Sequence, residues 1–520
     1  VHFEYSDRGR GPVLESRIVL DPDGIPERLH TNGNDYLKAP VAEIFSRVAG
    51  KAEWNNKAES GSVTLDGPAF YYSLEASKEE LGILAGALAN AEGQRLALLP
   101  SGEAFVEILD DVQLESNGIQ RRVRHYEITG LGFLPVSVWL DESGSFFGFV
   151  DSWLSVIPEG WEGAVETLLE VQQTRSVARE QQWATELADL PANGFAITGV
   201  RLFDADSAVT REGMTVLVVG DTIQAVGTDG SINLQDDVHL IDGTGKTLLP
   251  GLWDMHTHLS DVDGPLNIAA GVTSIRDMAN TMETLLALKN RFDSGEAIGP
   301  RVRMAGIIEG PGPFAAPTNV LVSTPGEAVD WVQKYAELNY DQVKIYSSVK
   351  PELVEPIALQ AHELGLRVSG HIPAGMWAED AVAQGYDEIT HINMFFLNFY
   401  KDVTDTRTPA RFTQVAQRGA DLNFGSIEVR AFIEKLKTAN VVVDPTVTIF
   451  ESMFRDRPGQ LSSSYAMIAD RLPPQVRRTL SSGGLPVPEG MEDQYKQSFQ
   501  RMLDAIKHLH DEGVTLVAGT

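Results

Sequence analysis

From residue 251 to residue 520, short apolar segments alternate with longer amphipathic ones, and this alternation constrains the fold more than any other feature of the sequence. A short apolar run bounded by turn residues is typical of a buried parallel strand. The intervening segments, such as residues 325–338 and 351–364, have helical spacing. Eight such units predict an α/β fold, a (β/α)8 TIM barrel. The expected strands are residues 252–256, 273–276, 301–305, 342–346, 367–371, 388–391, 440–444 and 515–518.

The chain before the barrel has a different character. A length of 520 residues suggests roughly three domains. Residues 1–160 carry runs of β-branched and aromatic residues separated by turns, which predicts a β-rich N-terminal domain; in it, Ser77 and Glu80 have the spacing of a helix capping box. Residues 161–194 change to helical spacing and predict a linking helix, and residues 195–250 return to short strands, which we expect to form part of a small β-sandwich.

Composition excludes several classes of function. The chain has 42 Lys and Arg against 73 Asp and Glu, a formal net charge of −31, which argues against nucleic acid as a partner. It has no Cys, so any metal must be held by His, carboxylate or modified Lys. No apolar run is long enough to form a transmembrane segment. The start at Val1 and the added β-rich domain favour a periplasmic or secreted location as an expectation, and the oligomeric state stays open.

Polar residues stand at the ends of four of the expected strands. His256 and His258 end the first strand, and residues two apart on a strand face the same way, so the two imidazoles can aim at one point. Lys344 lies within the fourth strand, His371 ends the fifth and His391 ends the sixth. Each is costly to place beside an apolar core without a partner. In a barrel the carboxyl ends of the strands form the active-site face, so we expect these five side chains to meet.

These motifs resemble those of the amidohydrolase superfamily, and most of all its imidazolonepropionase-like and prolidase-like branches. The resemblance covers about residues 195–520. It implies that His256, His258, Lys344, His371 and His391 are ligands of two divalent metal ions, with Lys344 carbamylated and bridging both. Imidazole and oxygen ligands together suit zinc, and also manganese, cobalt or nickel. The motifs that carry it are Gly251-Leu-Trp-Asp-Met-His-Thr-His258, Gly271-Val-Thr-Ser-Ile-Arg-Asp277, Val343-Lys-Ile-Tyr346, Gly370-His-Ile-Pro373 and Thr390-His-Ile-Asn393.

One part of the family pattern is not matched. The family places an Asp at the end of strand eight, where it binds metal and accepts the proton of the attacking water. Here that Asp would be expected directly after Val517-Ala518-Gly519-Thr520. We therefore expect the barrel unit, residues 251–520, to lack its C-terminal end.

Three further features have candidate roles at the site. Tyr346 follows Lys344 by two residues, so both side chains face the same way, and its hydroxyl could contact the substrate. Arg276 ends strand two, where it could clamp a substrate carboxylate or form a structural ion pair. The long loop of residues 310–323 follows strand three and could line or cover the pocket.

The resemblance implies a hydrolase, in which a metal-bridging hydroxide attacks an amide bond of a small peptide-like or N-acyl amino acid substrate. Ester, lactone, lactam or phosphotriester bonds are alternatives, because the same hydroxide can attack each. A mononuclear deaminase or ring hydrolase is a second alternative, although the Glu expected a few residues after His371 is missing and Lys344 is present. A metal-retaining scaffold with a binding domain is the non-enzymatic alternative.

Overall fold

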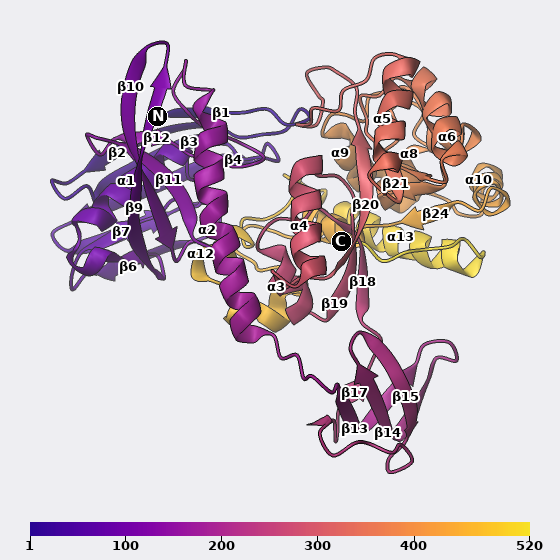
Figure 1. The fold of residues 1–520 in the computed structure, drawn as a ribbon. Helices are drawn as coiled ribbons and strands as arrows, with labels where there is room; N and C mark the ends of the chain where they lie inside the picture. The colour runs from indigo at the N-terminus through magenta and orange to yellow at the C-terminus, as the bar shows by residue number, and fades with distance from the viewer.

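The computed structural model describes residues 1–520, which form a β-rich N-terminal part, a small sheet and a barrel (Figure 1). The N-terminal part begins with a six-stranded antiparallel sheet in which each strand pairs with the next along the chain. Its inner face buries Leu29 and Phe45. The strands are β1 (His2–Glu4), β2 (Val13–Leu20), β3 (Pro26–Asn34), β4 (Pro40–Val48), β5 (Lys51–Asn55) and β6 (Ser60–Thr64).

A second six-stranded sheet follows, and helix α1 (Lys78–Asn90) packs on it. The predicted capping box is not formed: Ser77 makes no side-chain bond to the helix, and the Glu80 carboxylate accepts bonds from Ser73 instead, at 2.7 Å from its backbone N and 2.8 Å from its Oγ. The strands are β7 (Ala69–Tyr71), β8 (Arg95–Leu99), β9 (Glu103–Ser116), β10 (Ile119–Thr129), β11 (Val136–Asp141) and β12 (Phe146–Gly148), and the 3-10 helix η1 (Glu92–Gln94) precedes β8.

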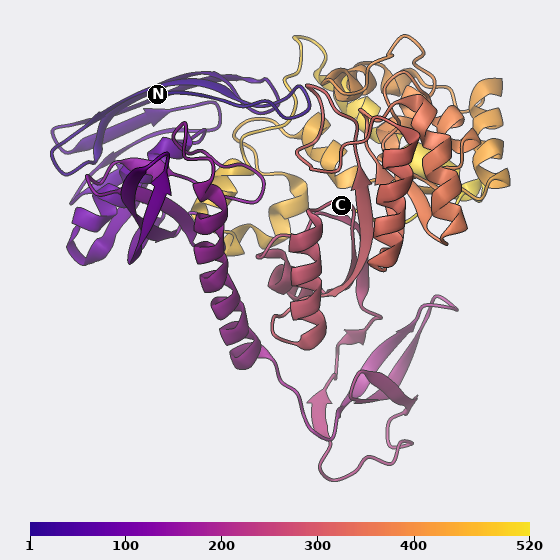
Figure 2. The same ribbon diagram turned by 45° about the horizontal axis from the view of Figure 1, so that its top comes forward.

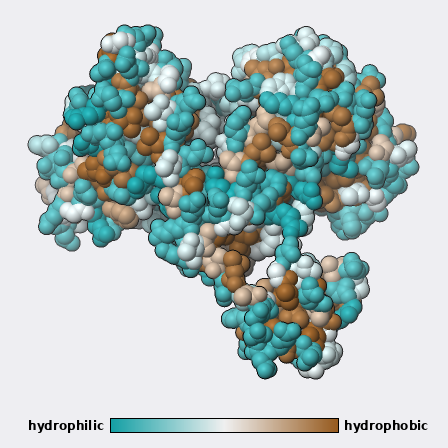
Figure 3. All heavy atoms as spheres, viewed as in Figure 1, coloured by the Kyte–Doolittle hydropathy of each residue, from teal (hydrophilic) through white to brown (hydrophobic).

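Helix α2 (Ala164–Leu187) leads from the N-terminal part to the small sheet, which stands apart from the barrel (Figure 1). Residues 195–250 form one sheet, without the second layer of the expected sandwich. Apolar side chains such as Ile223 and Leu240 are consequently exposed, and brown patches mark this unit in Figure 3. The strands are β13 (Phe195–Asp204), β14 (Val209–Val219), β15 (Thr222–Thr228), β16 (His239–Asp242) and β17 (Thr247–Leu248).

The expectation of a parallel barrel sheet is confirmed for seven strands, each of which overlaps a predicted one. Their side chains and those of the surrounding helices form the largest core cluster, with 54 buried residues. The strands are β18 (Leu252–Thr257), β19 (Val272–Asp277), β20 (Arg301–Ile308), β21 (Gln342–Ile345), β22 (Arg367–Gly370), β23 (Glu388–Thr390) and β24 (Val442–Asp444).

Residues 515–518 take the place predicted for the eighth strand. The backbone N of Val443 donates to the oxygen of Thr515 at 3.0 Å, and the N of Val517 donates to the oxygen of Val443 at 3.1 Å. On the other side, the N of Met255 in β18 donates to the oxygen of Ala518 at 2.8 Å. These bonds connect the last strand to the first.

Helices lie between the barrel strands. None of the helices in the structure combines the length and apolar character that a membrane span requires. They are α3 (Asp263–Ala269), α4 (Met282–Ser294), α5 (Pro325–Glu337), α6 (Val354–Glu363), α7 (Ala378–Ala383), α8 (Ile392–Leu397), α9 (Ala410–Arg418), α10 (Ile427–Thr438), α11 (Val447–Arg455), α12 (Pro474–Thr479) and α13 (Glu492–Asp511), with 3-10 helices η2 (Pro351–Leu353), η3 (Gly419–Asp421) and η4 (Ser463–Arg471).

The N-terminal part is fastened to the barrel unit by polar contacts at two places. Near α12, the Nε of Arg478 donates to Glu59 at 2.6 Å. Between α2 and α4, the Nε of Arg291 donates to Glu180 at 2.8 Å. In addition, the connection between β1 and β2 extends from the first sheet to the mouth of the barrel (Figure 2).

Candidate metal centre

The structure brings the five predicted ligand residues together at one end of the barrel. His256 lies in β18 and Lys344 in β21, while His371 and His391 directly follow β22 and β23. All strands of this sheet run parallel, so their carboxyl ends meet on one face. Lys344 is fully buried, three of the histidines are nearly so, and His258 is exposed at the mouth.

Distances among the five side chains show a contiguous cluster. The Nζ of Lys344 lies 3.0 Å from the Nε2 of His256, and the Nε2 atoms of His371 and His391 lie 3.0 Å apart. The ring of His256 is centred 4.9 Å from that of His391 and 5.6 Å from that of His258. Side chains from four separate strands therefore line one small volume.

Unusual backbone conformations hold two of the histidines. Gly370, just before His371, has a φ of +138°, and a Cβ there would stand 2.1 Å from the backbone oxygen of Ile345, so only glycine fits. His391 itself has a φ of +72°. Such conformations are rare for residues other than glycine, cost about 1–3 kcal/mol and gather at functional sites.

Each of the four imidazoles has its Nδ1 tied to a group outside the cluster. The Nδ1 of His258 donates to the backbone oxygen of Ala279 at 2.7 Å. In the neutral ring, the Nε2 is then unprotonated and has a lone pair available for a metal. The other three partners are oxygen atoms too: Asp444 Oδ2 for His256 at 2.6 Å, Ser347 Oγ for His371 at 3.2 Å and Thr446 Oγ1 for His391 at 2.7 Å. Outer hydrogen bonds of this kind are typical of imidazoles that bind metal.

Burial also sets the charges in the cluster. It holds the pKa values of His256, His371 and His391 well below the usual range of imidazole, so these rings are neutral at pH 7. It lowers the pKa of Lys344 to about 7, so a substantial share of this amine is neutral as well. Neutral nitrogen is the form that binds metal or reacts as a nucleophile.

Asp444 also belongs to the site, although its side chain was not predicted from the sequence to do so. It ends β24, is fully buried, and holds His256 through its Oδ2. Its Oδ1 is buried without a hydrogen-bond partner, and burial together with the nearby Glu388 raises the pKa of this carboxyl to about 8. Its position at the end of the expected strand of residues 440–444 was the available signal, the same one that singled out His371.

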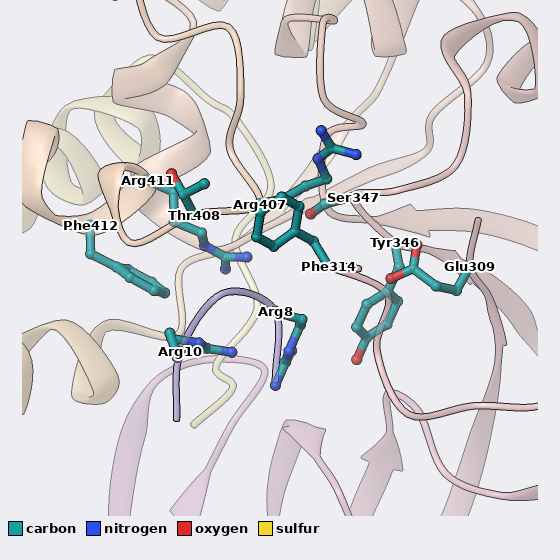
Figure 4. Close-up of a pocket in the computed structure, with 10 residues that line it drawn as sticks. All are labelled: Arg8, Arg10, Glu309, Phe314, Tyr346, Ser347, Arg407, Thr408, Arg411 and Phe412. Atoms are coloured by element: carbon teal, nitrogen blue, oxygen red, sulfur yellow. The ribbon is translucent and has the colours of Figure 1, made fainter. Parts of the chain in front are cut away.

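Tyr346 connects the cluster to an adjoining pocket. Its ring is centred 4.5 Å from the ring of His371, and the Nζ of Lys344 lies 5.1 Å from its centroid, so Lys344 and Tyr346 share a side of the strand. The hydroxyl has no partner within the protein and faces the pocket in Figure 4. Burial raises the pKa of Tyr346 to about 12, so the hydroxyl keeps its proton and can donate it in a hydrogen bond.

The prediction that Arg276 could clamp a substrate carboxylate is not supported, because its guanidinium N–H groups are engaged inside the barrel. Its two terminal nitrogens bind the Glu388 carboxylate at 2.7 and 2.6 Å, and its Nε donates to the backbone oxygen of Met255 at 2.8 Å. The side chain is only 5% exposed. Of the two sequence-based alternatives, the structure therefore favours the structural ion pair over a clamp for substrate.

The long loop after β20 lines the pocket, as its position suggested. Glu309 organises the start of this loop by accepting backbone N–H bonds from Gly310 at 2.8 Å, Ala316 at 3.0 Å and Ser348 at 2.9 Å. Phe314, near the tip of the loop, contributes its ring to the pocket wall (Figure 4).

Comparisons with known proteins give only distant likenesses. No family model and no curated protein matches the sequence. Among solved structures, a Xaa-Pro dipeptidase with bound methionine is 18% identical with a TM-score of 0.43, covering 63% of this chain and 79% of the other. A putative prolidase from Bifidobacterium longum is 19% identical with a TM-score of 0.42, covering 64% and 74%. A bottromycin amidohydrolase is 20% identical with a TM-score of 0.48, covering 66% and 71%.

These three structures are of a dipeptidase, a putative prolidase and an amidohydrolase. Their identities and TM-scores are too low to carry an argument about activity. The evidence for a function is the geometry and chemistry of the site itself.

The donor set fits divalent metal, although no three His, Asp or Glu side chains stand in metal-binding geometry. The side chains stand too close together for that geometry, because the ring nitrogens of His256, His371 and His391 are in contact with one another or with Lys344. With Nδ1 protonated, the Nε2 lone pairs of His371 and His391 face each other at 3.0 Å, an unfavourable contact that a cation between or beside them would relieve. The Nε2 of His256 faces Lys344 at the same distance, where an ammonium would repel a metal ion and a carbamate would attract one.

Proposed function

We propose that this protein is a metal-dependent hydrolase that cleaves an amide bond in a small peptide-like or N-acyl amino acid substrate. The observation that carries the proposal is the convergence of four imidazoles and one buried lysine, all four Nδ1 atoms being tied outward. The proposed ligands of two divalent ions, zinc as the first choice, are His256, His258, carbamylated Lys344, His371 and His391.

Bound metal would supply an activated water at neutral pH and would polarise the scissile carbonyl. The residues of the chain orient the imidazole ligands and the substrate. Asp444 and Thr446 fix the rings of His256 and His391 at 2.6 and 2.7 Å, so their Nε2 atoms stay directed inward. The Tyr346 hydroxyl, which has no internal partner, donates a hydrogen bond to the substrate carbonyl or to a substrate carboxylate.

The proposal is tested by measuring metal content and hydrolysis together. Purified full-length chain should hold about two equivalents of divalent metal and should hydrolyse members of a panel of dipeptides and N-acyl amino acids. Lys344→Ala should lose both metal and activity, with partial recovery on adding formate or acetate, because a short carboxylate can replace the missing bridge. Lys350→Ala is the matched control, since Lys350 is exposed and close in sequence.

Each other outcome points to a different function. Wild-type metal content and turnover in Lys344→Ala would contradict the bridging role. One metal per chain with ammonia release from a heterocycle would favour a deaminase. Turnover of esters or phosphotriesters alone would mean that the same metal centre cleaves those bonds and not amides. A metal-loaded chain that hydrolyses none of the substrates would favour a non-enzymatic scaffold.

A further inference from the structure

The connection between β1 and β2 places a tight hairpin, residues 7–11, in the mouth of the barrel (Figures 2 and 4). Asp7 and Arg10 exchange two backbone hydrogen bonds of 2.9 Å, and the two central residues, Arg8 and Gly9, have φ values of +53° and +71°. Positive φ at both central positions is typical of the type I′ turn that connects paired strands. A well-formed tip of the N-terminal part thus lies against the candidate active site.

The hairpin is in close contact with the barrel loops. A Cβ on Gly9 would lie 3.0 Å from the Phe314 ring, in the loop after β20. The Arg10 guanidinium lies 5.7 Å from the centroid of Phe412 in α9. Arg8 and Arg10 therefore line the same pocket as Tyr346 (Figure 4).

This pocket is rich in arginine in a strongly acidic chain. Two of its four arginines, Arg8 and Arg10, come from the hairpin, and Arg407 and Arg411 come from the barrel unit. Carboxylates offset three of these charges. Asp7 binds Arg8 through two bonds of 2.8 and 3.1 Å and lies 3.7 Å from Arg10, and Asp405 binds Arg407 through bonds of 2.9 and 2.8 Å. Glu309 adds a third carboxylate to the pocket lining without an ion pair to any of the four arginines.

Arg411 is the arginine without a partner. Its guanidinium takes part in no ion pair or hydrogen bond, its Nε is buried and unsatisfied, and the residue is 8% exposed. Its nearest favourable contact is with the Phe412 ring, 4.6 Å from its central carbon. Burial, together with the charges of Arg10 and Arg8, lowers the pKa of Arg411 to about 9.

A buried guanidinium that is still charged at pH 7, surrounded by other cations and lacking any acceptor, is costly unless an anion joins it. Its planar donors match a carboxylate in particular. The site adjoins the candidate metal centre, because Tyr346 lines the pocket and also packs on His371.

We propose that Arg411, with Arg8 and Arg10 of the N-terminal hairpin, binds a carboxylate of the substrate, so that the N-terminal part completes the specificity pocket of the barrel. This deepens the proposed function and rests on it for the identity of the pocket as the substrate site. One uncompensated positive charge favours a monoanionic substrate, such as a peptide or N-acyl amino acid with a free carboxyl end. Arg411 makes the main contact, and the hairpin, held by Asp7, supplies the surrounding positive potential.

The binding step can be tested apart from hydrolysis. 4-Phenylbutyrate and 4-phenylbutanol have the same apolar body, differ in the carboxylate and contain no bond to cleave. Their dissociation constants are measured by calorimetry on the full-length chain after dialysis against a chelator, so that metal cannot capture the carboxylate. We expect the carboxylate to bind at least about tenfold more tightly, the value of one charge-assisted hydrogen bond.

The variants identify the responsible residues. Arg411→Met should abolish the preference for the carboxylate, Arg411→Lys should keep part of it because the charge stays while the planar fork is lost, and Arg8→Met should reduce it several-fold. Arg418→Met is the matched control, since Arg418 lies on the same helix but binds Asp402 outside the pocket, at 2.8 Å. It should leave the preference unchanged.

Equal binding of the two probes by the wild type, or an unchanged preference in folded Arg411→Met, would overturn the proposal. If Arg411→Met fails to fold, Arg8→Met decides, because Arg8 lies at the half-buried tip of the hairpin and outside the barrel core. An unchanged preference there would refute the part played by the hairpin. Failure of the proposed function gives a different result: the protein would still prefer the carboxylate probe but would hydrolyse none of the substrates. Hydrolysis of N-acyl amino acids and their amides at equal rates would leave the function standing and remove this inference.

Discussion

Replacing Arg276 by methionine separates the two roles that the sequence left open for it. The Arg276–Glu388 pair is buried in the barrel and has good geometry, with two bonds of 2.7 and 2.6 Å. Removing one partner of such a pair leaves an uncompensated charge and typically costs about 3–5 kcal/mol. We therefore expect Arg276→Met to lower the free energy of unfolding by that amount.

The surroundings of the pair predict an asymmetry between its two members. A second carboxyl oxygen, Asp444 Oδ2, lies 3.8 Å from the Nη2 of Arg276. Glu388 is one cause of the raised pKa of Asp444, so the loss of Glu388 favours ionisation of Asp444, which can then offset the charge of Arg276. Glu388 has no other cation within ion-pair distance. Glu388→Gln should consequently cost less than Arg276→Met, and the double variant Arg276→Met/Glu388→Met should recover most of the loss, because it leaves neither charge unpaired.

Urea unfolding followed by circular dichroism gives the stabilities, and substrate affinity is measured on the same variants. A structural pair predicts a large coupling energy between the two positions and little effect of Glu388→Gln on KM. If Arg276→Met unfolds within about 1 kcal/mol of the wild type but raises KM for carboxylate substrates, Arg276 is a substrate clamp and the reasoning is wrong.

Two further substitutions test other parts of the structure. Burial raises the pKa of Glu80 to about 7, above its unfolded value of 4.5, so stability is lost as pH rises between these values. Glu80→Gln should match the wild type near pH 4 and exceed it at pH 8 by roughly 3 kcal/mol, and equal thermal stability at pH 8 would contradict this. Gly370→Ala should displace His371 and reduce the amount of bound zinc, because the new Cβ would meet the Ile345 backbone oxygen at 2.1 Å. The control Gly326→Ala, whose Cβ would have no atom within 4 Å, should bind zinc normally. Normal zinc binding in both variants would show that this turn does not position His371.

The arrangement of the barrel strands followed from local pattern. Strands such as β21 and β22 are short and alternate with helical segments, and the positions of His256, Lys344 and His371 in the strands or at their carboxyl ends predicted that these side chains meet on one face of the barrel. The candidate ligands could be found because each interrupts an apolar strand at the same end.

Contacts between distant segments were beyond the same reasoning. Glu80 was assigned to a capping box from its spacing to Ser77, yet its carboxylate binds Ser73, seven residues away. Arg276 finds Glu388 112 residues later, and such a partner is set by the closure of the barrel. The arginines of the hairpin precede the barrel by more than two hundred residues in the sequence, and nothing local connects Arg8 to Tyr346.

The position of that hairpin is fixed by contacts far from the pocket, which argues for a preformed wall of the site over a swinging lid. The Arg478–Glu59 bond of 2.6 Å joins the barrel unit to the first sheet, and the Arg291–Glu180 bond of 2.8 Å ties α2 to α4. The hairpin itself is braced by the Tyr36 hydroxyl, which donates to Asp7. A rigid element places charge more precisely than a mobile loop does, and an arginine held in advance loses less freedom when an anion binds.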